Sequence, residues 1–409
     1  MEKHKQSIDQ LSKTLLKLLE SKGYSPGTLL KYSRMLSQIS VFMKRGEYES
    51  YTENVGDIFF ADYIARKTYT IGRQQQIKTT LRRLNELTNG VNYKLTKQSP
   101  EAPPPPQFTE LLEEYIKFCT SIGNKENTIT TKRRFCREFL YSIADAGCKN
   151  ISDINTMYIC KAILRTNDKD AYAVIRSFLR HLYENGTISN DLSGIIPKYR
   201  RPIPLPATYT DDEINRLENI FNRTTSAGKR NYAIFLLASR LGIRCGDIVG
   251  MTFDNLDFNR GCIDFIQNKA GKPQSLPLLP QIRHAIEDYL QYARPNVNNN
   301  YLFIRLKAPF EQISTTAIRQ MLTECFKAAG IDISNKKHGP HTLRSSMASS
   351  MVNSNIPYDV VRKTLGHTDP QAIKRYAKVD IENLRIHAID VPAPVGVFAM
   401  ILQGREHIC

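Results

Sequence analysis

The sequence lacks any run of about 20 consecutive apolar residues, the length that a helix needs to cross a bilayer. Its first ten residues, MEKHKQSIDQ, are polar and lack the apolar segment of a secretory signal peptide. These two absences argue against a membrane-spanning or exported protein. We therefore expect a protein of the cytosol.

Paired cysteines and nucleotide-binding loops are also missing. The eight cysteines are scattered, and none forms a Cys-x-x-Cys pair, which argues against a zinc site and a disulfide framework. We expect small buried thiols in a reducing compartment. There is no Gly-x4-Gly-Lys-Ser/Thr phosphate loop and no carboxylate cluster suited to Mg²⁺. The sequence therefore predicts neither a metal nor a nucleotide cofactor.

Positive charge is plentiful. Lys and Arg number 57 against 40 Asp and Glu, a net charge of +17, and the pI is about 9.4. A basic chain fits a polyanionic partner, because each cation placed against a phosphate releases a counterion. Charge alone fits a merely basic surface equally well. The choice between these two interpretations depends on the motifs.

Two proline-bearing segments, 102–106 (APPPP) and 198–206 (KYRRPIPLP), divide the chain. They predict domains at 1–100, 107–197 and 207–395. Apolar residues at three- and four-residue spacing predict that the first two domains are helical, and their shared order of features suggests a duplicated helical module. The helices are expected near 8–21, 27–44, 57–66, 73–88, 108–122, 127–146, 153–165 and 168–185.

The third domain has a mixed pattern. Strands are expected at 261–267 and 275–279, joined by the turn 269–272. The fold class that we predict is mainly α with a small antiparallel β-sheet, an α+β third domain after two helical domains. The helices of the third domain are expected near 211–222, 227–240, 244–251, 281–292, 314–329, 341–354, 357–365 and 370–378.

Several polar residues of the third domain stand beside apolar periodic runs. Arg244 begins a helix, where it is either a structural side chain with a buried stem or an anion hook. His341 and Arg344 are three residues apart, so both project from one helix face, as suits an oxyanion. His367 follows a helix, and Tyr376 comes nine residues later. Taken singly, each has an ordinary structural explanation; their joint order does not.

That order resembles the catalytic domain of the tyrosine recombinase (phage-integrase-like) family. The matching segments are LGIRCGDIVGMTFDNLDF, FIQNKAGKPQSLPL, HTLRSSMAS and VRKTLGHTDPQAIKRYAKV. The resemblance covers about residues 207–390. It extends more loosely to 107–197, where NTITTKRRFCREFLYSI is similar to the family's helical core-binding domain. Residues 1–100 resemble the same helical module or an arm-type DNA-binding domain.

The resemblance implies a role for each matching residue. Tyr376 would be the nucleophile that forms a 3′-phosphotyrosyl link and frees a 5′-hydroxyl. Arg244 and Arg344 would clamp the non-bridging phosphate oxygens. Lys269 would protonate the leaving 5′-oxygen. The remaining implied roles are deprotonation of Tyr376 by His341, a hydrogen bond from His367 to the phosphate, and support of an Arg or His by Asp247 behind them.

Such a set makes chemical sense. A free tyrosine has a pKa near ~10, so cationic groups and an acid–base pair are needed to make it a nucleophile at neutral pH. The covalent link keeps the energy of the broken phosphodiester, so no ATP is needed. Guanidinium groups stand where two-metal nucleases use divalent ions.

Two assignments stay open within this set. Lys272 lies in the same turn as Lys269, although the first lysine matches the family position better. His338 lies close to His341, but only His341 has the three-residue spacing to an arginine. The segment after Arg344 reads Ser-Ser-Met-Ala where the family commonly has His-Thr-Phe-Ala, and we interpret this difference as packing.

Basic residues outside the third domain predict further DNA contacts. Most would touch phosphate and few would read bases, while a solvated helix face is the alternative for each. The predicted contacts are Lys132, Arg133, Arg134 and Arg137 in the second domain, and Arg73, Lys78, Arg82 and Arg83 in the first.

The resemblance also implies an assembly. The second and third domains would form a C-shaped clamp around double-stranded DNA, and a homo-tetramer would join two DNA sites, with an accessory directionality factor as a further partner. No membrane is implied, and the protein would associate with the nucleoid when bound to DNA. The expected role is integration or excision of a mobile element. Alternatives are a Xer-like resolvase, a type IB topoisomerase and a non-catalytic DNA-binding protein.

Overall fold

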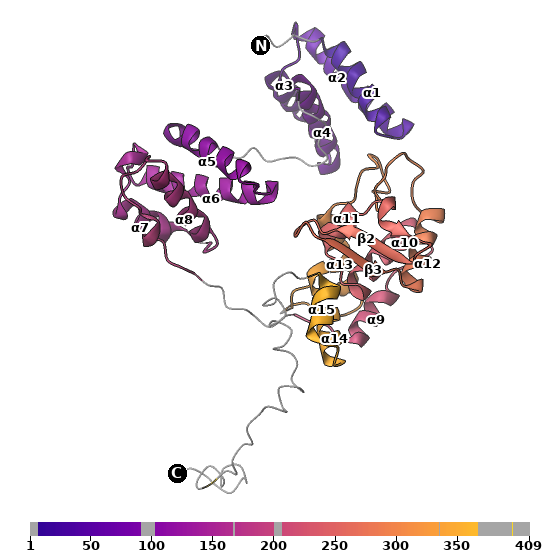
Figure 1. Ribbon diagram of the computed structural model, residues 1–409. Helices are drawn as coiled ribbons and strands as arrows, with labels where there is room; N and C mark the ends of the chain where they lie inside the picture. Colours follow the sequence, from indigo (N-terminus) through magenta and orange to yellow (C-terminus); the bar gives the residue numbers. More distant parts are fainter. Residues whose placement is uncertain are drawn as a thin grey trace, which may run out of the picture. The chain divides into compact units, whose positions relative to one another are not determined.

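The chain divides into two compact units, which are described separately: residues 94–203 form one, and 1–93 with 204–409 form the other. The structure is a computed structural model (Figure 1) and describes residues 7–90, 103–166, 168–199, 207–334, 336–366 and 395. Among these residues, no helix is long and apolar enough to cross a membrane.

Residues 7–90 build helices around a hydrophobic core of their own. The helices are α1 (Ile8–Ser21), α2 (Pro26–Arg45), α3 (Glu53–Ala65) and α4 (Ile71–Thr88). Leu15, Leu19, Ile39 and Leu84 are buried at its centre. Each helix begins at a Ser or Thr whose hydroxyl accepts a backbone N–H, as at Thr52, where Val55 donates at 3.3 Å.

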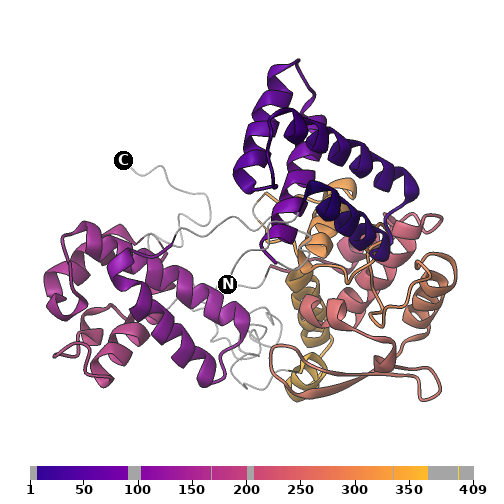
Figure 2. The same ribbon diagram turned by 90° about the horizontal axis from the view of Figure 1, so that it is seen from above.

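Residues 103–199 form a second set of packed helices, shown in magenta in Figure 2. These are α5 (Thr109–Ser121), α6 (Glu126–Asp145), α7 (Thr156–Arg165) and α8 (Ala171–Glu184). Helix α6 packs against α5, α7 and α8. Its buried face carries Phe135, Cys136, Phe139 and Ile143, at the three- and four-residue spacing of one helix side.

Residues 207–366 are built around helix α10 (Ser226–Arg240), whose residues 232–239 are all buried. It packs against α12 (Pro280–Tyr292) and α14 (Pro340–Asn353). Small buried side chains of α14, among them Ser345 and Ala348, permit close approach of the helices. The other helices are α9 (Asp211–Asn219), α11 (Cys245–Gly250), α13 (Thr315–Ala328) and α15 (Tyr358–Leu365).

A three-stranded antiparallel sheet lies beside these helices, in the order β1 (Leu256–Asp257), β2 (Cys262–Ile266) and β3 (Pro273–Pro277). In the β2–β3 hairpin, Ile263 pairs with Leu276 and Ile266 with Pro273. Ile263 and Leu276 are buried, whereas Ile266 is exposed. The hairpin therefore packs one face on the core and projects its turn outward.

The predicted fold class, mainly α with a small antiparallel sheet, is confirmed. The helix predictions agree with the structure, with the largest shift at α3, which begins at Glu53 rather than 57 because Thr52 caps it. Strand β1 was not predicted, since two residues carry no alternation pattern. The helix predicted at 370–378 lies outside the described residues.

Candidate active site

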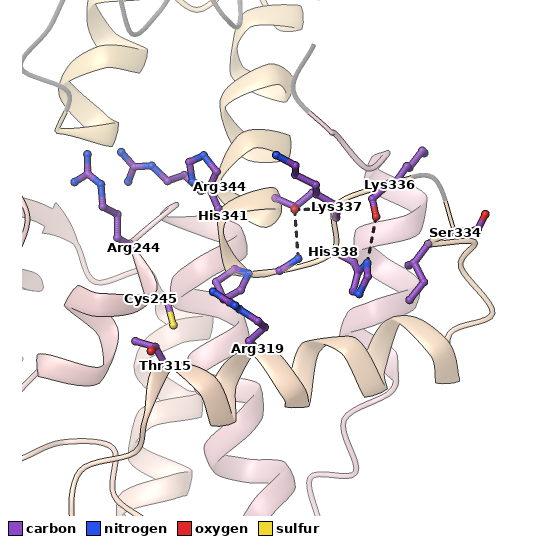
Figure 3. Close-up of a pocket in the computed structure, with 14 residues that line it drawn as sticks. Arg244, Cys245, Thr315, Arg319, Ser334, Lys336, Lys337, His338, His341 and Arg344 are labelled. Carbon is purple, nitrogen blue, oxygen red and sulfur yellow. Dashed lines mark hydrogen bonds between the residues drawn. The ribbon is translucent and has the colours of Figure 1, made fainter. Parts of the chain in front are cut away.

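A cavity of about 800 Å³ opens in residues 207–366, between the start of α11, helix α13 and the segment that leads into α14. Five of the residues that line it carry a fixed positive charge, and two more are histidines. None of the described residues that line it is Asp or Glu. The cationic lining consists of Arg244, Arg319, Lys336, Lys337 and Arg344, with His338 and His341 (Figure 3).

The sequence predicted three of these residues together. Arg244, His341 and Arg344 come from segments about 100 residues apart, and the fold brings them to one cavity. Figure 3 shows the side chains of Arg244 and Arg344 extending toward the same end of the cavity, with Lys336 toward the other. Several cations without an anionic neighbour in the lining suit a phosphate group, since guanidinium forks match its oxygens.

Arg344 belongs to the second turn of α14 and is only 3% exposed. Its Nη1 donates to the carbonyl of Gly242 at 2.6 Å, and its Nη2 donates to the carbonyl of Leu365. Gly242 lies just before α11, and Leu365 is the last residue of α15. The guanidinium group therefore joins three segments around the cavity and is fixed in direction before any ligand binds.

Arg244 is the N-cap residue of α11 and is half-buried. Its Nη1 donates to Oε1 of Gln267 at 3.0 Å. Of the two interpretations that the sequence left open, a purely structural side chain and an anion hook, the position in the cavity lining favours the hook. The hydrogen bond to Gln267 restricts the rotation of the Arg244 side chain.

The predicted general acid, Lys269, lies in the turn between β2 and β3 and is exposed, as is Lys272. Neither is among the described residues that line the cavity. Asp247, expected to support an Arg or His, is buried, and its Oδ1 accepts the backbone N–H of Asn268 at 2.7 Å. This carboxylate therefore holds the residue that directly precedes Lys269, a contact that the sequence did not predict.

Both histidines of the open assignment, His338 and His341, line the cavity. His341 is exposed at the second position of α14. His338 precedes the helix; its Nδ1 lies 3.1 Å from the carbonyl oxygen of Lys336, and its ring packs edge-on against Phe326. His341 is the more exposed of the two residues.

The other cationic residues of the lining were not predicted from the sequence. Lys336 and Lys337 lie just before the segment that contains His341 and Arg344. These two adjacent lysines were the sequence signal that could have identified this part of the lining. Arg319 projects from α13, where nothing in the local pattern marks it. Cys245 also lines the cavity, and burial raises the pKa of its thiol to about 11, against the opposing effect of the Arg319 charge. The thiol is thus neutral and adds no anion.

The predicted nucleophile, Tyr376, and His367 lie outside the described residues. Gly366 is the C-cap residue of α15, has a left-handed φ of 59° and immediately precedes His367. Among the described residues, no group of three or more His, Cys, Asp or Glu side chains could hold a metal ion.

Known proteins are similar to this chain in sequence and in fold. Residues 208–383 match the model of the phage integrase family. Tyrosine recombinase XerD of Lacticaseibacillus casei is 30% identical over 215 residues, which cover 52% of this chain and 72% of that protein. The chain belongs to the phage integrase family of tyrosine recombinases. Membership makes it an enzyme of DNA strand transfer.

Solved structures of tyrosine recombinases share the fold. XerH site-specific recombinase, in a post-cleavage complex with palindromic difH substrate, matches with a TM-score of 0.53 and 13% identity over 94% of this chain and 97% of that one. A lambda integrase tetramer bound to a Holliday junction matches with a TM-score of 0.51 and 18% identity over 73% of this chain and 85% of that one.

The basic cluster predicted on α6 of this recombinase has partners within its own unit. Arg133 pairs with Glu113 of α5, with Nη2 and Oε2 at 3.0 Å, and Lys132 Nζ lies 3.4 Å from Cys119 Sγ. Arg134 is more exposed and stacks on Phe135 at 4.1 Å. Lys132 and Arg133 therefore also hold α6 against α5.

The basic residues of α4 that were predicted to contact DNA differ in their exposure. Lys78 is exposed over the ring of Phe60 at 4.9 Å, and Arg73 donates to Tyr63 Oη at 3.0 Å. Arg83, in contrast, is 3% exposed, and its Nη1 lies 2.5 Å from Oε2 of Glu86. Burial of Arg83 beside Glu86 favours a structural role for this side chain over a DNA contact.

Proposed function

We propose that this tyrosine recombinase is a site-specific DNA recombinase that integrates or excises a mobile element through Tyr376. The observation that carries the proposal is the cavity to which Arg244, His341 and Arg344 all contribute, and whose charged lining is entirely basic among the described residues. An anionic phosphodiester is the ligand that this lining fits best.

Cleavage would be a transesterification that balances without any co-reactant. The Oη atom of Tyr376 bonds to the scissile phosphorus as the bond from phosphorus to the 5′-oxygen breaks. The phenolic proton passes to His341, and Lys269 gives a proton to the leaving oxygen. Arg244, Arg344 and His367 hold the phosphate oxygens and offset the charge of the pentavalent transition state. Reversal by another 5′-hydroxyl rejoins the strand.

The hairpin supports the role of Lys269. Its turn extends from the sheet, and Asp247 holds the residue before it. An exposed lysine on a turn held by Asp247 can reach a scissile phosphate in a bound duplex. Lys272 in the same turn is the alternative acid, and its substitution belongs in the same experiments.

The DNA complex would use the domains 1–100, 107–197 and 207–395, the last two closing as a C-shaped clamp on the duplex. Phosphate contacts outside the cavity are proposed for Lys132, Arg133, Arg134 and Arg137, and for Arg73, Lys78 and Arg82. Four protomers would exchange strands between two sites, by analogy with the lambda integrase tetramer on a Holliday junction. An accessory directionality factor would choose integration or excision.

The second candidate function is resolution of chromosome or plasmid dimers. The XerD relative favours it, because it matches over more than half of this chain. The two functions share every catalytic step and differ in the DNA site and its location.

The test is covalent trapping on DNA. The protein is incubated with nicked suicide duplexes drawn from its own genetic neighbourhood, with EDTA present, and products are separated on a denaturing gel. We expect a DNA-linked protein band that Tyr376→Phe abolishes while duplex binding persists. Lys269→Ala and Lys272→Ala, compared side by side, identify the general acid.

Each result decides between functions. Trapping at a mobile-element border supports integration or excision, and trapping at a replication-terminus site supports resolution. Relaxation of plasmid without a preferred site would favour topoisomerase activity. Tight, specific binding without any covalent product would overturn the catalytic proposal in favour of a DNA-binding protein.

A further inference from the structure

We propose that Gln267 is a positioning residue that aligns Arg244, the turn of Lys269 and the end of α15 as one catalytic unit. The inference rests on the proposed function and deepens it, because it assigns a role to a residue outside the cavity lining. Gln267 follows β2 directly and is 1% exposed. A side-chain amide this deeply buried needs hydrogen-bond partners for both of its polar atoms.

The first partner is Arg244, whose Nη1 donates to Gln267 Oε1 at 3.0 Å. A guanidinium group only donates, so the contact fixes which end of the amide faces it. Arg244 has a long side chain with several rotatable bonds. The hydrogen bond made by Nη1 restricts the directions in which the other guanidinium nitrogens can donate. The bond therefore directs the guanidinium toward the cavity that it lines.

The second contact is through the backbone of Gln267, which closes the lysine turn. Its carbonyl accepts the N–H of Gly271 at 2.8 Å, and its N–H donates to the carbonyl of Lys272 at 2.9 Å. Lys269 lies inside this closed loop. Both bonds are made by backbone atoms, so a substitution of the Gln267 side chain keeps the turn closed and acts first on Arg244.

The third contact leads to α15. Gln267 Nε2 donates to Oε1 of Gln274 on β3, and Gln274 Nε2 donates to the carbonyl of Thr364 at 2.5 Å. Gly366 lies against the same pair: a Cβ atom there would stand 1.7 Å from Gln267 Nε2. The amide thus occupies the space that a side chain at Gly366 would fill, one residue before His367.

Only an amide of this length meets all these demands. Methionine fills a similar volume but accepts no strong hydrogen bond from Arg244. Glutamate has no proton for Oε1 of Gln274 and adds a negative charge beside the arginine. Asparagine is one methylene too short. Gln267→Met is therefore the substitution that removes the contact with the least change of packing.

The experiment measures single-turnover cleavage of a suicide duplex at saturating protein, by wild type and Gln267→Met. Two substrates are compared: the ordinary phosphodiester and one with a methylphosphonate at the scissile position. Methylphosphonate lacks the negative charge that Arg244 offsets, so a misaligned guanidinium matters less on it. We expect a loss of about 10- to 100-fold on the phosphodiester, the range for a hydrogen bond to a charged group, and much less on methylphosphonate.

The matched control is Gln312→Met, which removes the bond from Gln312 Nε2 to the carbonyl of Val249 at 2.6 Å in the same domain. It should cleave both substrates like wild type. A second variant, Gln274→Met, keeps the bond from Arg244 to Gln267 but removes the acceptor of Gln267 Nε2. It should give a smaller loss of cleavage with the same substrate preference. DNA affinity and melting temperature are measured for all variants.

Equal losses of Gln267→Met on both substrates, or wild-type rates, would overturn the inference while leaving the proposed function intact. Failure of the wild-type protein to form any covalent product would overturn the proposed function and this inference with it. If Gln267→Met does not fold, Gln274→Met decides: a loss confined to the phosphodiester supports the inference, and no loss contradicts it.

Discussion

The backbone N–H of Asn268 donates a hydrogen bond of 2.7 Å to Oδ1 of the buried Asp247. Asp247 stands in the first turn of α11, three residues after Arg244, and Asn268 directly precedes Lys269. One carboxylate thus connects the helix that begins at an arginine of the cavity with the turn that carries the proposed general acid. Its substitution should affect proton transfer to the leaving group before it affects DNA binding.

The first prediction concerns Asp247→Ala. Loss of the acceptor frees the lysine turn, and we expect cleavage to fall about 10-fold or more, the cost of losing a charge-assisted hydrogen bond. Asp247→Asn, which keeps an oxygen for Asn268, should retain more activity. The measurement is cleavage of a duplex whose leaving atom is a 5′-bridging sulfur, which needs little protonation. Asp247→Ala should recover on this substrate, as should Lys269→Ala.

The control for Asp247→Ala is Asp257→Ala. Asp257 Oδ1 also accepts backbone N–H groups in a turn of the sheet, from Asn259 at 3.0 Å and Arg260 at 2.8 Å. It should cleave both substrates at wild-type rates. A defect of Asp247→Ala that persists with the sulfur leaving group would contradict the role assigned to this carboxylate.

The second prediction concerns Arg344→Lys. A lysine keeps the charge but cannot donate along the two fixed directions toward Gly242 and Leu365 that the guanidinium satisfies. We expect cleavage to fall about 100-fold or more and stability to fall by about 1–3 kcal/mol, because buried carbonyls lose a donor. Cleavage is compared with thermal denaturation.

Arg294→Lys separates stability from catalysis in that comparison. Arg294 also serves carbonyl groups, with Nη2 at 2.6 Å from Asn299 O and 2.9 Å from Tyr301 O, but it does not line the cavity. It should lower the melting temperature without lowering cleavage at a temperature where the protein is folded. Equal catalytic losses in both variants would mean that Arg344 acts only through folding.

The third prediction compares two glycines with left-handed backbone. Gly366 has φ of 59° and Gly271 has φ of 66°, so alanine strains both by about 1 kcal/mol. At Gly366 the added Cβ also meets Gln267, whereas at Gly271 nothing lies within 4 Å. Gly366→Ala should therefore destabilise the protein more and impair cleavage, and Gly271→Ala should cost only the backbone strain. Urea denaturation measures the difference, and equal midpoints would contradict it.

The fourth prediction separates Arg82 from its neighbour Arg83. Both reach Glu86, but the Arg83 side chain is 4% exposed and that of Arg82 is 23% exposed. Arg83→Met should destabilise residues 7–90 by about 1–3 kcal/mol, since Glu86 loses its close hydrogen-bond donor, and should leave DNA affinity unchanged when folded. Arg82→Met should lower DNA affinity and leave the stability of residues 7–90 unchanged. Denaturation and filter-binding measurements check both, and a DNA-specific loss in Arg83→Met would contradict the burial argument.

The sequence predicted what depends on local pattern. The spacing of His341 and Arg344 needs only helix geometry, and the hairpin around Lys269 needs only alternation and a turn. Arg82 and Arg83 could not be distinguished, because adjacent basic residues look alike until the helix is oriented on its core. The role of Gln267 was invisible, since it depends on Arg244, Gln274 and Thr364, which the fold assembles from distant segments. Local chemistry could be predicted, whereas the tertiary connections of the site could not.

The last prediction concerns the cationic residues of the cavity lining that were not predicted from the sequence. Arg319, Lys336 and Lys337 line the cavity with Arg244 and Arg344, and their charges suit phosphates beside the scissile one. Removing one phosphate contact should reduce the slope of log affinity against log salt by about 0.9. Arg319→Ala, Lys336→Ala and Lys337→Ala are therefore titrated against duplex DNA from about 50 to 200 mM salt. Arg260→Ala is the control, because Arg260 is 71% exposed, lies near Asp264 at 3.4 Å and is outside the lining. An unchanged slope in all three variants would mean that this end of the cavity does not hold the DNA backbone, whereas a smaller slope in Arg260→Ala as well would mean that the effect reflects net charge alone.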